Sequence, residues 1–112
     1  MMGLFDCIIG ALRGLSDWFV DVLKRVINFL QDIVGWFKSQ RLDPKKHTPF
    51  IVKCDNEIRE MLHRAPRKDE GIFKGYLDEV DGTITGYEME TDKGVDAKTE
   101  EVLGGEKIVV LQ

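Results

Sequence analysis

The side chains best suited to acid–base, nucleophilic or metal chemistry in this sequence are two histidines, His47 and His63, and two cysteines, Cys7 and Cys54. Cys54 and His63 could form a thiolate–imidazolium pair, but no flanking motif supports one. No CxxC or Cys/His spacing of a zinc site is present. His63 lies in the last turn of a predicted helix, where the helix dipole favours an imidazolium. We therefore expect solvent-facing or capping histidines and reduced thiols, and a reducing cytoplasm as the compartment.

Acidic side chains gather around residues 78–92, which suggests a cation site as one reading. The segment "DEVDG" lacks the spacing of a calcium-binding loop, so we interpret these carboxylates as a solvated hairpin. The chain contains no GxxxxGK[ST] phosphate loop, no GxGxxG after a strand and no GxSxG nucleophile motif. We expect no catalytic residue, metal site, cofactor or small-molecule substrate, and hence a protein that is not an enzyme.

Basic side chains form the remaining candidate site. We predict a basic docking patch from Lys45, Lys46, Arg64, Arg67 and Lys68. A nucleic-acid-binding module is the last-ranked reading of this patch, because the net charge is −4 and the acidic hairpin would repel phosphates. No predicted strand carries the aromatic pair of RNA-binding modules.

The charge and the apolar residues are unevenly distributed along the 112 residues, a length that suits one domain. Residues 1–40 are neutral and hold 23 apolar residues and six of the ten aromatic residues. Residues 41–74 carry a net charge of +3, and residues 75–112 carry −7. We expect an apolar arm, a mildly basic middle and an acidic end, and complementary charges of this kind suit contacts between copies.

The arm, residues 1–40, is predicted as one long amphipathic helix, because its apolar residues recur every three or four positions. The predicted interaction face consists of Ile8, Leu12, Leu15, Phe19, Val22, Val26, Leu30, Ile33 and Phe37. Glycines at 10 and 14 leave open whether the helix is straight or kinked. Candidate membrane anchors at or near the apolar half are Phe5, Trp18 and Trp36.

A straight helix of this length is about 50 Å long, whereas the remaining 72 residues form a globule with a radius of gyration of about 11 Å. Such a helix could not bury its whole apolar stripe on its own domain. Either the arm breaks in two and folds back, or its face meets another copy, a partner protein or a membrane surface. No run of residues is long and apolar enough to span a bilayer.

The rest of the chain is predicted as a linker, residues 41–49, and a small α+β domain, residues 50–112. Asp55 and Asp96 are expected to cap short helices, and Asp81-Gly82 to form a hairpin turn. The order strand–helix–strand–strand–helix–strand is that of a ferredoxin-like split βαβ unit. A three- or four-stranded antiparallel or mixed sheet is the more general expectation.

These patterns lead to one main functional hypothesis and one alternative for the same segment. The main hypothesis is a non-enzymatic interaction protein whose N-terminal helix drives homo-oligomerisation or binds a partner helix, with the α+β domain as a docking surface. The alternative is a peripheral membrane-binding or membrane-perturbing protein that uses the same helix.

Overall fold

A computed structural model describes residues 3–15 and 18–111 of the chain. The elements in chain order are α1 (Leu4–Arg13), β1 (Val20–Leu23), a π-helical segment η1 (Phe29–Val34), α2 (Gly35–Ser39), β2 (His47–Cys54), α3 (Asn56–Met61), β3 (Gly71–Asp78), β4 (Thr83–Thr91), α4 (Ala97–Leu103) and β5 (Ile108–Val110). The predicted α+β class is confirmed.

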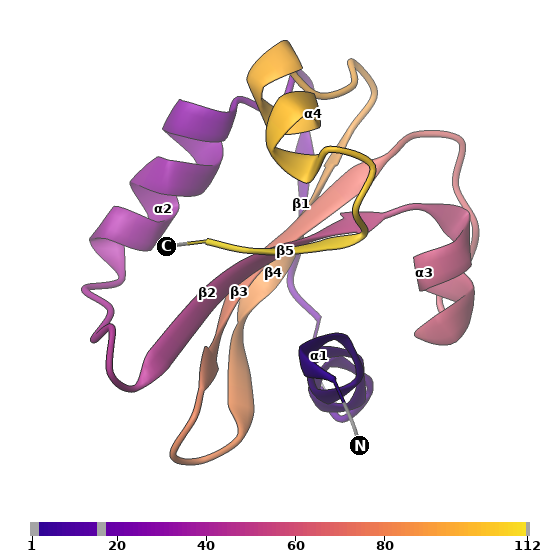
Figure 1. Ribbon diagram of the computed structural model, residues 1–112. Helices are drawn as coiled ribbons and strands as arrows, with labels where there is room; N and C mark the ends of the chain where they lie inside the picture. Colours follow the sequence, from indigo (N-terminus) through magenta and orange to yellow (C-terminus); the bar gives the residue numbers. More distant parts are fainter. Residues whose placement is uncertain (1–2, 16–17, 112) are drawn as a thin grey trace.

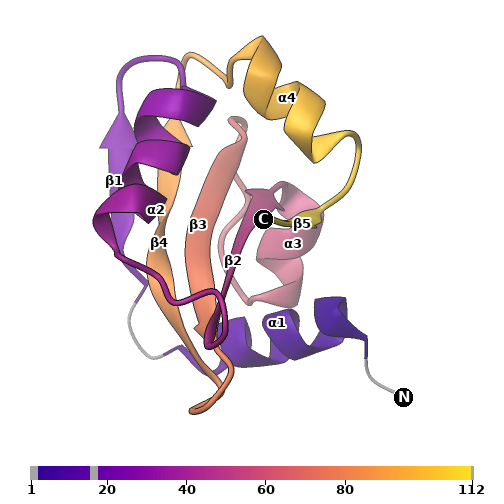
Figure 2. The ribbon, with the colours of Figure 1, turned by 60° about the vertical axis from the view of Figure 1, so that its left-hand side comes forward.

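The five strands form one mixed sheet in the order β1-β4-β3-β2-β5. β1 runs parallel to β4, and the other neighbouring strands are antiparallel. Helices α1 and α3 cover one face of the sheet, while η1, α2 and α4 cover the other (Figures 1 and 2). The sheet is therefore the middle layer of three, and its central strands are buried on both faces.

The alternation of side chains along the strands separates two apolar cores. Phe50 and Val52 of β2 and Phe73 of β3 point toward α1 and α3. Ile51 and Ile72, their neighbours in the same strands, point toward η1, α2 and α4. This explains why these strands read as continuous apolar runs rather than as alternating ones.

The predicted single helix over residues 1–40 is wrong. α1 ends at Arg13 with Gly14 as its C-cap, and residues 20–23 form β1 instead of further helical turns. The chain becomes helical again at Phe29, after the N-cap Asn28, whose side chain accepts hydrogen bonds from two N–H groups of η1. Residues 1–2 and 16–17 of the predicted helix lie outside the described residues.

The physical reason for this break is the length of the apolar stripe, which one straight helix could not bury on its own domain. The segment divides into two helical parts and a strand, and these parts bury apolar residues on both faces of the sheet. Ile8 and Leu12 lie in the core with α1, and Ile27 and Ile33 lie in the other core. The predicted arm thus supplies one strand of the sheet and part of each core.

The element order predicted for the C-terminal part is confirmed, but the ferredoxin-like topology is wrong. In a split βαβ unit, the two strands flanking the helix run parallel with another strand between them. Here α3 connects β2 and β3, which are antiparallel neighbours. β2 also begins at His47, so the last residues of the predicted linker belong to the sheet.

The local signals of this part act as expected. The Asp55 and Asp96 side chains accept hydrogen bonds from the N–H groups of Ile58 and Thr99 at the starts of α3 and α4. Gly82 has a φ of 70° in the turn between β3 and β4. Among the described residues, no helix has the length and apolar character needed to cross a membrane.

Candidate functional site

The structure divides the predicted interaction face. The buried members are Ile8, Leu12 and Ile33, and the partly buried ones are Leu15 and Phe37. The exposed members are Phe19, Val22, Val26 and Leu30. The face predicted as one continuous stripe is therefore partly core and partly surface, because its residues no longer lie on one helix.

The exposed members and Val20 form a group that we call the β1 strip: Phe19, Val20, Val22, Val26 and Leu30. Seven large apolar residues are exposed among the described residues, and five of them are in the strip. Phe19, Leu30 and Val22 are 67 %, 65 % and 64 % exposed. An accumulation of this kind on a small protein is typical of an interaction surface.

Val20 and Val22 of the β1 strip lie on the edge strand of the sheet, where β4 pairs with one side of β1, while Phe19 precedes this strand and Val26 and Leu30 follow it. The N–H of Glu88 in β4 donates to the carbonyl of Phe19. Because backbone groups alternate in direction along a strand, the N–H and C=O groups of Val20 and Val22 point away from β4. Among the described residues, no strand pairs with this outer side, which leaves donors and acceptors available to another chain.

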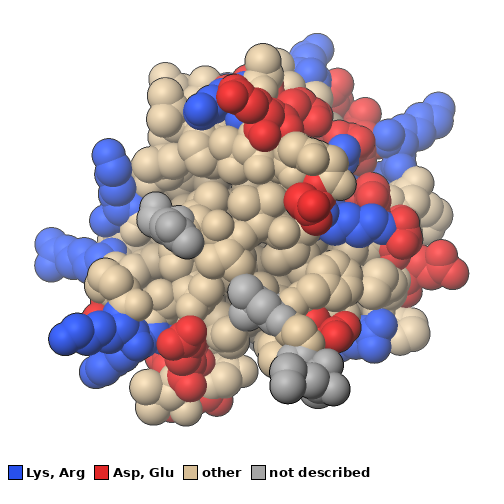
Figure 3. Space-filling model, in the orientation of Figure 1, with Lys and Arg blue, Asp and Glu red and all other residues tan. Residues whose placement is uncertain are grey.

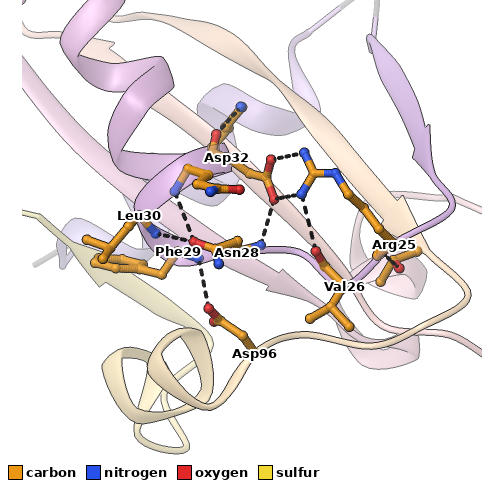
Figure 4. A network of polar contacts seen from close by, with 10 residues as sticks. Arg25, Val26, Asn28, Phe29, Leu30, Asp32 and Asp96 are labelled. Atoms are coloured by element: carbon orange, nitrogen blue, oxygen red, sulfur yellow. Dashed lines mark hydrogen bonds and ion pairs between the residues drawn. The ribbon is translucent and has the colours of Figure 1, made fainter.

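A polar network holds the second half of the strip in place (Figure 4). The Asn28 side chain accepts from the Leu30 and Gln31 N–H groups, and Asp32 accepts from the Asn28 N–H and the Arg25 guanidinium. Burial opposes ionisation of Asp32, but these hydrogen bonds outweigh it and lower the Asp32 pKa. The segment after β1 is therefore a fixed surface.

The three candidate membrane anchors lie in different surroundings. Phe5 on α1 is 39 % exposed. Trp18 is partly buried, with its ring 4.8 Å from that of Phe73 and the Arg64 guanidinium 4.5 Å above it. Trp36 is also partly buried and packs against Phe37 and Tyr87. The two tryptophans therefore contribute to internal packing.

The predicted basic patch is not one surface. Lys45 and Lys46 precede β2 near Asp78, at one end of β3, whereas Arg64 and Arg67 lie near the other end. A strand of eight residues separates these ends by roughly 25 Å. Arg67 and Arg64 pair with acidic side chains of β4, as described below, and Lys68 lies exposed beside them.

The arginines near β4 form an arginine–glutamate cluster with Glu88 and Glu90. Glu88 is fully buried, with Oε2 3.1 Å from Arg64 Nη2 and Oε1 3.8 Å from Arg59 Nη2. Arg67 pairs with Glu90. Arg59 also donates to the Asn56 side chain and the Asp69 carbonyl. A buried carboxylate requires such partners, because desolvation of a lone charge costs several kcal/mol.

Glycine and cysteine complete the surroundings of Glu88. A Cβ on Gly71 would lie 3.0 Å from Glu88 Oε1 and 3.3 Å from Arg59 Nη2, so the glycine makes room for the ion pair. Burial raises the pKa of Glu88, and the nearby arginines oppose this rise. Burial also raises the pKa of Cys54 well above its usual range, with Glu88 adding to the effect. Cys54 is thus a neutral thiol and a poor nucleophile.

The cluster and the β1 strip are adjacent. Val20 pairs with Glu88 and Val22 with Glu90 in the parallel register, so these side chains share the face that carries α3. A hollow of about 440 Å³ lies between them, lined by Val20, Arg59, Arg64, Ala65, Arg67 and Glu90. The described residues hold no group of three potential metal ligands. The arrangement is suited to binding, with exposed apolar side chains beside a charged cluster in which, among the described residues, the buried Glu88 oxygens have ion-pair partners but no hydrogen-bond donor.

Sequence reasoning missed two parts of this site: the strand β1 with Val20, and the burial of Glu88 between Arg59 and Arg64. The segment "VDVL" alternates apolar and acidic residues, which is a strand signal that the helical periodicity concealed. Comparison with profiles of known families, with curated proteins and with solved structures finds no significant match. The functional argument therefore rests on geometry.

Proposed function

We propose that this protein is a non-enzymatic interaction protein that assembles with a second copy of itself through the outer edge of β1. The observation that carries the proposal is a strand edge, unpaired among the described residues, that bears the exposed Val20 and Val22 and is flanked in sequence by the exposed Phe19, Val26 and Leu30. Addition of a strand supplies backbone hydrogen bonds, and the apolar side chains supply the driving force. The predicted role in assembly is retained, but a strand takes the place of the helix.

A second copy suits this edge because a strand edge can be self-complementary about a two-fold axis. An antiparallel pair of β1 strands centred on Val22 brings the two exposed Val22 side chains together on one face. It also sets each Asp21 opposite Leu23 of the other copy. Centring the pair on Asp21 would instead oppose two carboxylates, which is unfavourable. The charges thus favour the register centred on Val22, which extends the sheet across both copies.

The experiment is sedimentation over a concentration series for the wild-type chain, Val22→Lys and Val80→Lys. Val80 lies in the β3–β4 turn and is 73 % exposed, so it controls for placing a lysine on an exposed valine. We expect dimers for the wild type and Val80→Lys, and monomers for Val22→Lys, because charged side chains block edge pairing. A wild type that remains monomeric to millimolar concentration refutes the proposal.

Two further measurements separate this function from its alternatives. Vesicle flotation tests binding to a membrane surface. If the wild-type chain is a monomer that binds vesicles, and Val22→Lys abolishes this binding, then the exposed apolar residues contact lipid rather than a second copy. Circular dichroism of Val22→Lys should match the wild type, since its outward-facing side chain is not part of either core. We also place the assembly in the cytoplasm, where the free thiols of Cys7 and Cys54 stay reduced.

A further inference from the structure

A second concave surface lies away from the β1 strip, between the η1–α2 segment and the C-terminal end of the chain. We call it the α2–β5 hollow. It encloses about 540 Å³, which is within the range of small-molecule sites. Its lining consists of Phe29, Val34, Phe37, Lys38, Arg41, Leu42, Pro49 and Leu111. Figure 3 shows a broad surface without charges on this side of the molecule, with basic side chains at its left margin.

The hollow continues into a second one of about 430 Å³, which shares Leu42, Pro49 and Leu111 with it and extends to His47. Because they share these walls, we treat the two hollows as one continuous track. Most of the track is lined by aliphatic and aromatic side chains. An extended, flexible apolar chain fits this shape.

The charged side chains that line the α2–β5 hollow among the described residues are both basic. Lys38 and Arg41 are exposed, and no described aspartate or glutamate contributes to the lining. Among the described residues, neither Lys38 nor Arg41 takes part in an ion pair, whereas Arg25, Arg59, Arg64 and Arg67 all do. Two cations beside an apolar track attract an anionic group at one end of an apolar ligand.

The backbone provides an independent sign that the position of Arg41 matters. Arg41 follows the C-cap of α2 with a φ of 52°, in the left-handed region that glycine usually occupies at this position. A side chain in this conformation costs conformational energy, and such outliers cluster at binding sites. Glycine would relieve the strain, but it would remove the guanidinium from the hollow.

We propose that the α2–β5 hollow binds a single-chain anionic amphiphile of the fatty-acid class. The alkyl chain lies along Phe29, Phe37 and Leu111, and the guanidinium of Arg41 and the ammonium of Lys38 hold the carboxylate. This activity is separate from the proposed self-assembly, because the lining shares no residue with the β1 strip.

The test is calorimetric titration of the wild type with decanoate and with decyltrimethylammonium, which has the same alkyl chain and the opposite head charge. We expect decanoate to bind at least tenfold more tightly. Lengthening the acid should tighten binding by roughly fourfold for each methylene that is buried. Equal affinity for the two head groups, or no binding of either amphiphile, overturns the proposal.

Three variants make the test specific. Arg41→Gly should weaken decanoate binding at least tenfold. His63→Gly is its matched control, because His63 also has a positive φ, 57°, just after α3, and is absent from the lining. It should bind decanoate as the wild type does. Unchanged affinity of Arg41→Gly refutes the assignment. Val22→Lys should also bind normally, so failure of self-assembly is distinguishable from failure of this site.

Discussion

Lys74 has an unusual position for a lysine, in the middle of the sheet. It is 2 % exposed, and its Nζ donates to the Asp32 carbonyl at 2.5 Å. The ammonium lies 4.4 Å from the centre of the Tyr87 ring and 5.2 Å from that of Trp36. Burial lowers the pKa of Lys74 from 10.5 to about 8, although Asp32 and Asp21 oppose the shift. We expect this amine to make folding stability depend on pH.

The direction and size of the effect follow from proton linkage. Between pH 8 and 10.5, the unfolded chain keeps the Lys74 proton and the folded chain releases it, so the free energy of unfolding rises with pH. The shift corresponds to about 3 kcal/mol over the whole range, at roughly 1.4 kcal/mol for each pKa unit. Of this, about 2 kcal/mol should appear between pH 8 and pH 10.

The assay is urea denaturation of the wild type and Lys74→Met at several pH values from 7 to 10. Methionine keeps an unbranched side chain of similar length and removes the titrating group. Subtracting the two curves cancels the other groups, including Cys54, whose thiol ionises in the unfolded chain but not in the folded one. The neighbouring Tyr87 should interfere little, because burial raises its pKa and shifts its ionisation to higher pH. The difference between the two curves therefore reports the titration of Lys74.

Two results would contradict this reasoning. If the wild type and Lys74→Met keep a constant difference in stability from pH 7 to pH 10, the amine is not perturbed by burial. If the wild type instead loses stability relative to the variant as pH rises, the folded state favours the charged form of Lys74. The contacts with Trp36, Tyr87 and Asp32 would then outweigh desolvation.

The remaining predictions concern backbone positions and are checked by urea denaturation at pH 7 unless stated otherwise. Gly86→Ala should destabilise the fold by about 3 kcal/mol or more, because its Cβ would lie 2.2 Å from the Lys74 carbonyl oxygen. Gly10→Ala, within α1 and with no atom within 4 Å, should stabilise it by about 1 kcal/mol, and a loss of stability would contradict this. Asp96→Ala should cost about 1–2 kcal/mol by removing the cap of α4 and the bond from the Phe29 N–H. Hydrogen bonds that Thr99 donates lower the Asp96 pKa in the folded chain, so the charge-dependent part of this cost should begin to decline near pH 3.8 and vanish only below the lowered pKa. A cost that does not decline on acidification would contradict this.

Much of the fold was predictable where the signal is local. The caps at Asp55 and Asp96, the turn at Gly82 and the end of α4 at Gly104 all depend on neighbours within a few residues. The α+β fold class was predictable for the same reason, since the strands and helices of the C-terminal part each have a local signal. These elements appear where the sequence predicts them.

The candidate site was less accessible to prediction. Phe19, Val22 and Val26 were assigned to an interaction face, and they are exposed, but they lie along a strand edge and the segment after it, not on a helix. Glu88 appeared to belong to a solvated hairpin, yet it is fully buried. Its burial depends on Arg59 and Arg64, and the sequence carries no mark of that distant pairing.

The sequence by itself therefore determined the α+β class, the helix caps, the β3–β4 turn and the excess of apolar residues in the first 40. Only the tertiary structure decided that this excess divides between two cores and an exposed edge. The physical reason is that "VDVL" fits both a helical stripe and a strand. Pairing Val20 with Glu88, far along the chain, selects the strand through contacts that no local pattern encodes.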